Sequence, residues 1–79
     1  MDASSIQKWL IERVAEETEQ SPDKIDPLLP FSTIGLDSAA ALALTGDLED
    51  LLNISIDPTV IFEYPNINKL ADYLAHHAA

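Results

Sequence analysis

The sequence lacks cysteine and is poor in basic residues. Its 79 residues include four lysines and arginines against fourteen aspartates and glutamates, which gives a formal net charge of −10. Without thiols the chain forms neither a disulfide scaffold nor a thiolate metal site. Because phosphate groups would be repelled, we expect the chain to bind neither nucleic acid nor an anionic membrane surface.

Long apolar runs and a basic, apolar leader are also missing. No stretch approaches the roughly 20 apolar residues that span a bilayer, and residues 1–5 do not resemble a signal peptide. We therefore expect a cytoplasmic protein. Hydrophobic residues make up 47% of the chain, too many for a disordered acidic tail. The length suits one domain over residues 1–79.

The acidic residues are unevenly distributed. Residues 25–68 contain seven acids and no base. An ordinary solvated surface would explain this pattern, and so would a docking face for partners with basic patches. The acids concerned are Asp26, Asp37, Asp47, Glu49, Asp50, Asp57 and Glu63.

The sequence of residues 1–37 predicts one helix and a long connection. Ser4 or Ser5 is a suitable cap for a helix that ends near Gln20. Its apolar face comprises Ile6, Trp9, Leu10 and Val14, with Trp9 expected to anchor the core. Prolines interrupt the next segment, residues 21–37, which we expect to be a loop with a short helical turn near residues 23–25. Its apolar residues should pack over the core, namely Ile25, Leu28, Leu29, Phe31, Ile34 and Leu36.

Asp37 and Ser38 begin a second helix that covers residues 39–52 and ends at Asn53. The weak helix formers Thr45 and Gly46 indicate an exposed or partner-facing position near its middle. Its buried stripe is predicted to be Leu44, Leu48, Leu51 and Leu52.

The remainder predicts two further helices. Ile54 or Ile56 should insert into the core before a short third helix, residues 59–63, which ends ahead of Pro65. Asn66 then caps a fourth helix with an apolar stripe formed by Ile67, Leu70, Ala71 and Leu74, beside Tyr73. The chain is therefore predicted to be an all-α bundle of four helices.

No pattern of a catalytic or metal site is present. The two histidines, His76 and His77, lie in the last four residues, where we expect fraying. Ser38 is the remaining candidate, because Asp37 is the better cap and leaves the serine hydroxyl free. The N-terminus of a helix also tolerates an attached phosphoryl group.

Two blocks of sequence resemble those of acyl carrier proteins. Residues 31–38 read F-S-T-I-G-L-D-S and resemble the family's F-x-x-(L/I)-G-L-D-S stretch, while residues 58–65 read P-T-V-I-F-E-Y-P and resemble P-T-x-x-F-(D/E)-Y-P. The resemblance extends from about Ile6 to Leu74. It implies an acyl-carrier-like four-helix bundle, with a long loop between helices 1 and 2 and a short third helix.

The resemblance also implies a function. Ser38 corresponds to the serine that receives 4′-phosphopantetheine from coenzyme A through a phosphopantetheinyl transferase, and Asp37 to the acid before it. The chain would then be a monomeric carrier and not an enzyme. Its partners would include a ketosynthase, an acyltransferase or an acyl-ligase with basic docking patches. The residues implied for partner contact are Ala39, Leu42, Asp47, Glu49, Asp50, Ile61 and Glu63.

Three interpretations remain at this point. The F-E-Y-P block favours a carrier of polyketide synthesis, although Ala39 stands where the family commonly has a large apolar residue. This departure suggests a narrower set of partners. The second interpretation is a peptidyl or aryl carrier of nonribosomal peptide synthesis. The third is a non-catalytic acidic adaptor in which Ser38 merely caps a helix.

Overall fold

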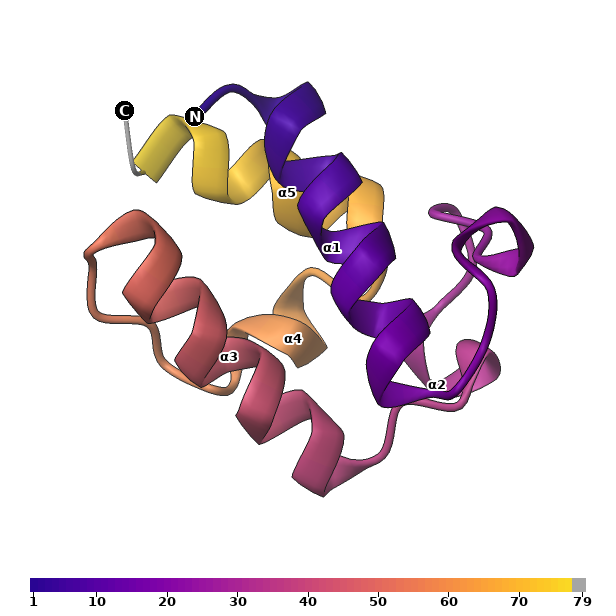
Figure 1. Ribbon diagram of the computed structural model, residues 1–79. Helices are drawn as coiled ribbons and strands as arrows, with labels where there is room; N and C mark the ends of the chain where they lie inside the picture. The colour runs from indigo at the N-terminus through magenta and orange to yellow at the C-terminus, as the bar shows by residue number, and fades with distance from the viewer. Residues whose placement is uncertain (78–79) are drawn as a thin grey trace.

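The computed structural model describes residues 1–77, and these residues contain helices and no strand (Figure 1). Three helices are long and three elements are short. In chain order they are α1 (Ala3–Glu17), the 3-10 turn η1 (Pro22–Lys24), α2 (Phe31–Ile34), α3 (Ser38–Leu52), α4 (Val60–Glu63) and α5 (Ile67–His77). The predicted all-α fold is confirmed, with one helix more than expected.

The core lies where the three long helices meet. α1 packs along α5 and also contacts α3, and α4 lies near the middle of α3 (Figure 1). Each long helix contributes side chains that are completely buried, because its apolar residues recur at helical spacing. They are Ile6, Leu10 and Val14 from α1, Leu44 and Leu48 from α3, and Ile67, Leu70 and Leu74 from α5. Trp9 is half-buried against this core.

α1 starts earlier and ends earlier than predicted. Asp2, and not Ser4 or Ser5, caps it, since the Asp2 carboxylate accepts a hydrogen bond of 2.8 Å from the Ser5 N–H. The helix ends at Glu17 because Glu19 has a φ of 56°, a left-handed conformation that a helix does not continue through. The predicted end near Gln20 was therefore wrong by one turn.

The connection between α1 and α3 is more ordered than a loop. η1 confirms the predicted turn, whereas α2 was missed. Pro30 precedes α2 and Gly35, with a φ of 106°, ends it. Phe31 is buried, and its N–H donates to the Pro65 carbonyl oxygen at 2.8 Å, which ties α2 to the start of α5.

The apolar residues of this connection do not all pack inward. Ile25, Phe31 and Leu36 are buried and Ile34 is half-buried, as predicted. Leu28 is 67% exposed and Leu29 is also exposed, which contradicts the prediction for them. The Asp26 carboxylate accepts a hydrogen bond from the Leu28 N–H at 2.9 Å, and this turn directs the next side chains outward.

α3 has nearly the bounds that its sequence predicts, but two details of its faces differ. Thr45 is only 2% exposed, so the prediction of an exposed position was wrong for it. Its hydroxyl donates to the Ala41 carbonyl oxygen at 2.8 Å, which allows a polar side chain to be buried. Leu51 is exposed and Leu52 half-buried, so the buried stripe is narrower than predicted.

The last two helices match their predictions closely. α4 follows Thr59, Ile56 is the isoleucine that enters the core, and Ile54 is half-buried. Asn66 caps α5 by accepting a hydrogen bond of 2.8 Å from the Lys69 N–H. α5 continues through His77 and so includes both histidines, while residues 78–79 of the segment where we expect fraying lie outside the described part.

Arg13 joins α1 to α3. It forms an ion pair with Asp47, pairs with Glu16 at 2.8 Å, and lies with its guanidinium carbon 5.8 Å from the centre of the Trp9 ring. Of these contacts, the ion pair with Asp47 is the one that reaches α3. No helix among residues 1–77 has the length and apolar character needed to cross a membrane.

The two glycines provide a matched test of the backbone. A Cβ would meet no atom within 4 Å at either Gly35 or Gly46. Gly46 has ordinary helical geometry, so Gly46→Ala should raise the free energy of unfolding by about 0.5–1 kcal/mol. Gly35→Ala should lower it by about 1–2 kcal/mol, because an L side chain is strained in the left-handed region. Urea unfolding of both variants measures this, and equal effects would contradict the assigned conformations.

Candidate functional site

Ser38 is the first residue of α3 and its side chain is exposed. Asp37 caps the helix, because its carboxylate accepts a hydrogen bond from the Ala40 N–H at 2.8 Å. The Ser38 hydroxyl itself forms no hydrogen bond with any residue in the described range. The serine is therefore not needed as a cap, and its oxygen is available at the positive end of the helix dipole.

The approach to α3 fixes where this hydroxyl lies. Leu36 is buried, so the chain is anchored in the core two residues before the serine. Gly35 makes the turn that leads there, since its left-handed φ ends α2. Ser38 is thus an exposed residue on a well-anchored segment.

Two apolar grooves meet at Ser38. The larger, of about 380 Å³, lies between α2, α3 and α4 and is lined by Phe31, Leu36, Ala41, Ile61 and Phe62 among others. The smaller, of about 210 Å³, is lined by Ser38, Ala41, Leu42, Pro58 and Phe62. An extended chain attached to the Ser38 oxygen, with methyl and methylene groups along it, would fit against either groove.

Phe62 borders both grooves and is 75% exposed. Sequence reasoning did not single it out. Phe62 belongs to the F-E-Y-P block, but α4 is a single turn, which is too short to show a helical pattern in the sequence. Only the structure shows that Ile61 is buried and Phe62 is exposed.

The other residues implied for partner contact divide into two groups. Ala39, Leu42, Asp50 and Glu63 are exposed, and Leu42 lies in the smaller groove with Ser38. The side chains of the other three residues are paired, hydrogen-bonded or buried within the chain. Asp47 pairs with Arg13, the Glu49 carboxylate accepts a hydrogen bond of 2.9 Å from the Ile56 N–H, and Ile61 is only 4% exposed.

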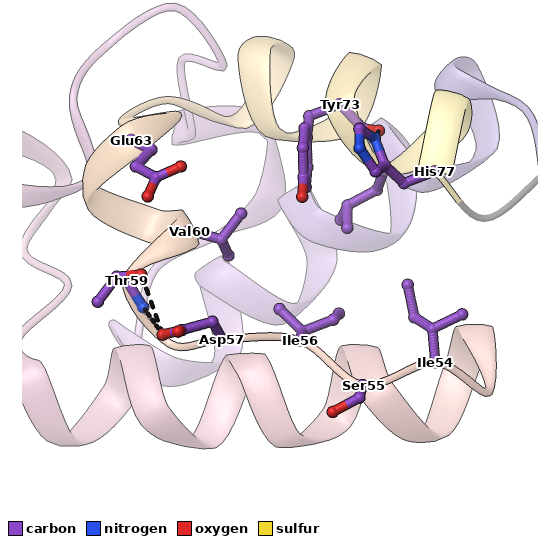
Figure 2. A pocket seen from close by; sticks show the side chains of 10 residues that line it. Ile54, Ser55, Ile56, Asp57, Thr59, Val60, Glu63, Tyr73 and His77 are labelled. Atoms are coloured by element: carbon purple, nitrogen blue, oxygen red, sulfur yellow. Dashed lines mark hydrogen bonds between the residues drawn. The ribbon is translucent and has the colours of Figure 1, made fainter.

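A separate pocket of about 350 Å³ lies between residues 54–59, α4 and α5 (Figure 2). Tyr73 and His77 of α5 form one wall and the segment from Ile54 to Asp57 forms the other. The rings of Tyr73 and His77 contact each other with their centres 4.0 Å apart and their planes tilted by 31°. Ser38 does not line this pocket, and residues 1–77 contain no cluster of three potential metal ligands.

Asp57 orders the turn that leads into α4. Its carboxylate accepts hydrogen bonds from the Thr59 N–H at 3.0 Å and from the Thr59 hydroxyl at 2.9 Å (Figure 2). These bonds stabilise the ionised form, and the backbone bond has the larger effect. Together they hold the pKa of Asp57 below its ordinary value of 3.8.

Comparisons with known proteins agree on the kind of site. Residues 8–74 match the family model described as "Phosphopantetheine attachment site". The chain is 36% identical over 72 residues to a phenolphthiocerol/phthiocerol polyketide synthase protein of Mycobacterium tuberculosis, covering 91% of this chain and 4% of the synthase protein. It is 34% identical over 73 residues to the acyl carrier protein TtuC of Teredinibacter turnerae, covering 92% and 84% respectively.

Solved structures show the same fold. A free-standing peptidyl carrier protein from Acinetobacter baumannii superposes with a TM-score of 0.95 at 40% identity, over 99% of this chain and 98% of that one. Asl1650, an acyl carrier protein from Anabaena, superposes with a TM-score of 0.91 at 37% identity, over 100% and 90%. The predicted bundle and the resemblance stated from the sequence are both confirmed.

The capping of α3 by Asp37 can be tested separately from the effect of the Asp37 charge. Asp37→Ala removes the acceptor for the Ala40 N–H and should lower the free energy of unfolding by about 1 kcal/mol. Asp37→Asn keeps a capping oxygen without the charge and should remain close to the wild type. Urea unfolding distinguishes the two, and an equal loss in both variants would mean that charge, not capping, is what matters.

The Asp57 turn predicts a dependence on pH. A carboxyl group with a lowered pKa stabilises the folded state at pH values above 3.8, and this contribution is lost as the pH falls through the lowered value. Asp57→Ala should therefore be less stable than the wild type near neutral pH, and the gap should narrow in acid. Thr59→Val keeps the backbone donor and should retain most of the wild-type pH dependence. A gap between Asp57→Ala and the wild type that stays constant into acid would contradict the assignment.

Proposed function

The chain belongs to the family of proteins that carry a phosphopantetheine attachment site, and from this premise we propose that it is an acyl carrier of polyketide synthesis whose 4′-phosphopantetheine is attached to Ser38. The cofactor follows from the family. The choice of Ser38 rests chiefly on one observation, an exposed hydroxyl with no hydrogen-bond partner in the described range, at the start of a helix that Asp37 already caps.

The attachment makes limited demands on this chain. The Ser38 oxygen attacks the phosphorus that joins pantetheine to the nucleotide in coenzyme A and forms a new P–O bond. The pyrophosphate bond breaks, adenosine 3′,5′-bisphosphate leaves, and the hydroxyl proton passes to a base of the transferase. The chain contributes a nucleophile on a fixed helix end, where the free N–H groups favour an anion.

The attached group supplies a terminal thiol that holds acyl groups as thioesters. This chemistry is consistent with a chain that has no cysteine of its own. The apolar grooves beside Ser38 offer contact surface to the methyl and methylene groups of the cofactor. Carriers of this family hold acyl groups and do not transform them, so we propose that this chain is the substrate of a transferase and not itself an enzyme.

Polyketide synthesis is the favoured setting because several of the relatives are polyketide synthases. The chain spans only 4% of the length of the first of them, so the activity of the whole synthase is not carried over. We propose that the partners are the phosphopantetheinyl transferase and synthesis enzymes such as a ketosynthase and an acyltransferase or acyl-ligase. We also propose that the carrier is monomeric.

A peptidyl carrier is the second candidate, favoured by the likeness to the Acinetobacter baumannii protein. The two functions share the fold and the attachment, and they differ in which enzymes load the thiol. Loading of the modified protein by amino acid-activating enzymes alone, and not by acyltransferases, would favour this second candidate.

The attachment site is tested by intact-mass measurement. Incubation with coenzyme A and a phosphopantetheinyl transferase should add roughly 340 Da to the wild type, a covalent change that mass spectrometry resolves. Ser38→Ala should abolish the gain. Ser32→Ala is the matched control, because Ser32 lines the same large groove and should be dispensable. No gain in the wild type, or a gain that survives Ser38→Ala, would contradict the proposal.

A further inference from the structure

The side chain of Gln20 joins the end of α1 to the end of α2. Its Nε2 group donates two hydrogen bonds of 2.9 Å, one to the Thr18 hydroxyl oxygen and one to the Ile34 carbonyl oxygen. A side-chain amide nitrogen has two N–H donors, so both are used here. The Thr18 hydroxyl in turn donates to the Val14 carbonyl oxygen at 2.7 Å. The amide is therefore held between the last turn of α1 and the last residue of α2.

The Ile34 carbonyl determines which way this amide faces. A carbonyl oxygen only accepts hydrogen bonds, so it needs the nitrogen and not the oxygen of the Gln20 side chain. Turning the amide over would bring two oxygen atoms together. The contact thus depends on a hydrogen-bond donor at position 20.

The backbone around Gln20 brings its side chain to this place. Glu19, directly before it, has a φ of 56°, which residues other than glycine rarely adopt. The Gln20 N–H donates to the carbonyl oxygen of the buried Ala15 at 2.9 Å. An unfavourable backbone conformation persists where the surrounding contacts stabilise it. The turn after α1 therefore directs the Gln20 side chain to the end of α2, although the residue itself is exposed.

The segment that Gln20 holds leads directly to Ser38. At the start of α2, the Phe31 N–H donates to the Pro65 carbonyl oxygen at 2.8 Å. Within the described residues, the bond from Gln20 is the one hydrogen bond that joins residues 32–36 to a distant part of the chain. Loss of this bond would leave the approach to Ser38 tied to other elements by its backbone only at the far end of α2.

We propose that Gln20 is a positioning residue for the modification of Ser38, because its donor holds the segment before α3 in the conformation that the transferase binds. This inference rests on the proposed function, since it assumes that Ser38 is the residue modified. When only a fraction of the molecules has the conformation that a partner binds, the apparent affinity falls by that fraction. Loss of the Gln20 donor should therefore raise KM and leave kcat nearly unchanged.

The test combines modification kinetics with amide hydrogen exchange, on the whole chain, with coenzyme A and a phosphopantetheinyl transferase of broad substrate range. Gln20→Ala should raise KM about three-fold, as expected if the competent fraction falls to about one third. In the same variant the N–H groups of Gly35 and Leu36, which donate to the Phe31 carbonyl oxygen at 3.2 and 3.0 Å, should exchange faster. Because the bond is exposed, Tm should stay within about 3 °C of the wild type.

Three further variants separate the donor from the size and charge of the side chain. Gln20→Glu keeps the shape but presents only acceptor oxygens, so it should behave like Gln20→Ala. Gln20→Lys restores a donor and should return KM and the exchange rates toward the wild type. Gln7→Ala is the matched control, because the Gln7 side chain also donates from α1 to a distant residue, Asn68 of α5. It should change KM less than about 1.5-fold.

The inference is overturned if Gln20→Ala has the KM of the wild type, or if Gln20→Lys does not restore it. A higher KM without faster exchange at Gly35 and Leu36 would also overturn it, because Gln20 would then contact the transferase directly. In each of these results Ser38 is still modified and the proposed function stands. A wild type that is not modified at all would overturn the proposed function and this inference together.

Discussion

The position of the first turn of α3 is the constraint on which the rest of the site depends. Asp37 satisfies the free N–H of Ala40, so Ser38 can begin the helix without using its own hydroxyl. Leu36 holds the approaching chain in the core, and the Arg13–Asp47 pair holds the helix farther along. The result is a serine hydroxyl that is exposed on a segment anchored in the core.

The high negative charge of the chain has a different meaning once the structure is considered. From the sequence, the acids of residues 25–68 could be explained by an ordinary solvated surface or by a docking face for basic partners. In the structure, most of them cap helices, order turns or hold α3, which a small bundle of short elements needs. Charge still aids solubility and steers encounters, and the smaller groove beside Ser38 is lined by apolar side chains that include Leu42 and Phe62.

Much of this fold could be predicted from sequence because the long helices have clear periodicity and good caps. α3 and its Asp37 cap, α4 and the Asn66 cap follow directly from residue types. α2 was missed because four residues are too few to show a helical period. Asp2 was missed because three neighbouring polar residues can all cap, and the choice depends on how α1 packs. The exposure of Phe62 depends on the rotation of a single helical turn, which only the tertiary structure determines.

The central claim is that Ser38 carries the phosphopantetheine. Peptide mapping by tandem mass spectrometry, on protein produced together with a phosphopantetheinyl transferase, tests it most directly. The account predicts that the group is found only on the peptide containing Ser38 and that fragment ions assign it to that residue rather than to Ser32. Detection of the group on Ser32 or on another serine, or its absence from every peptide, would contradict the account.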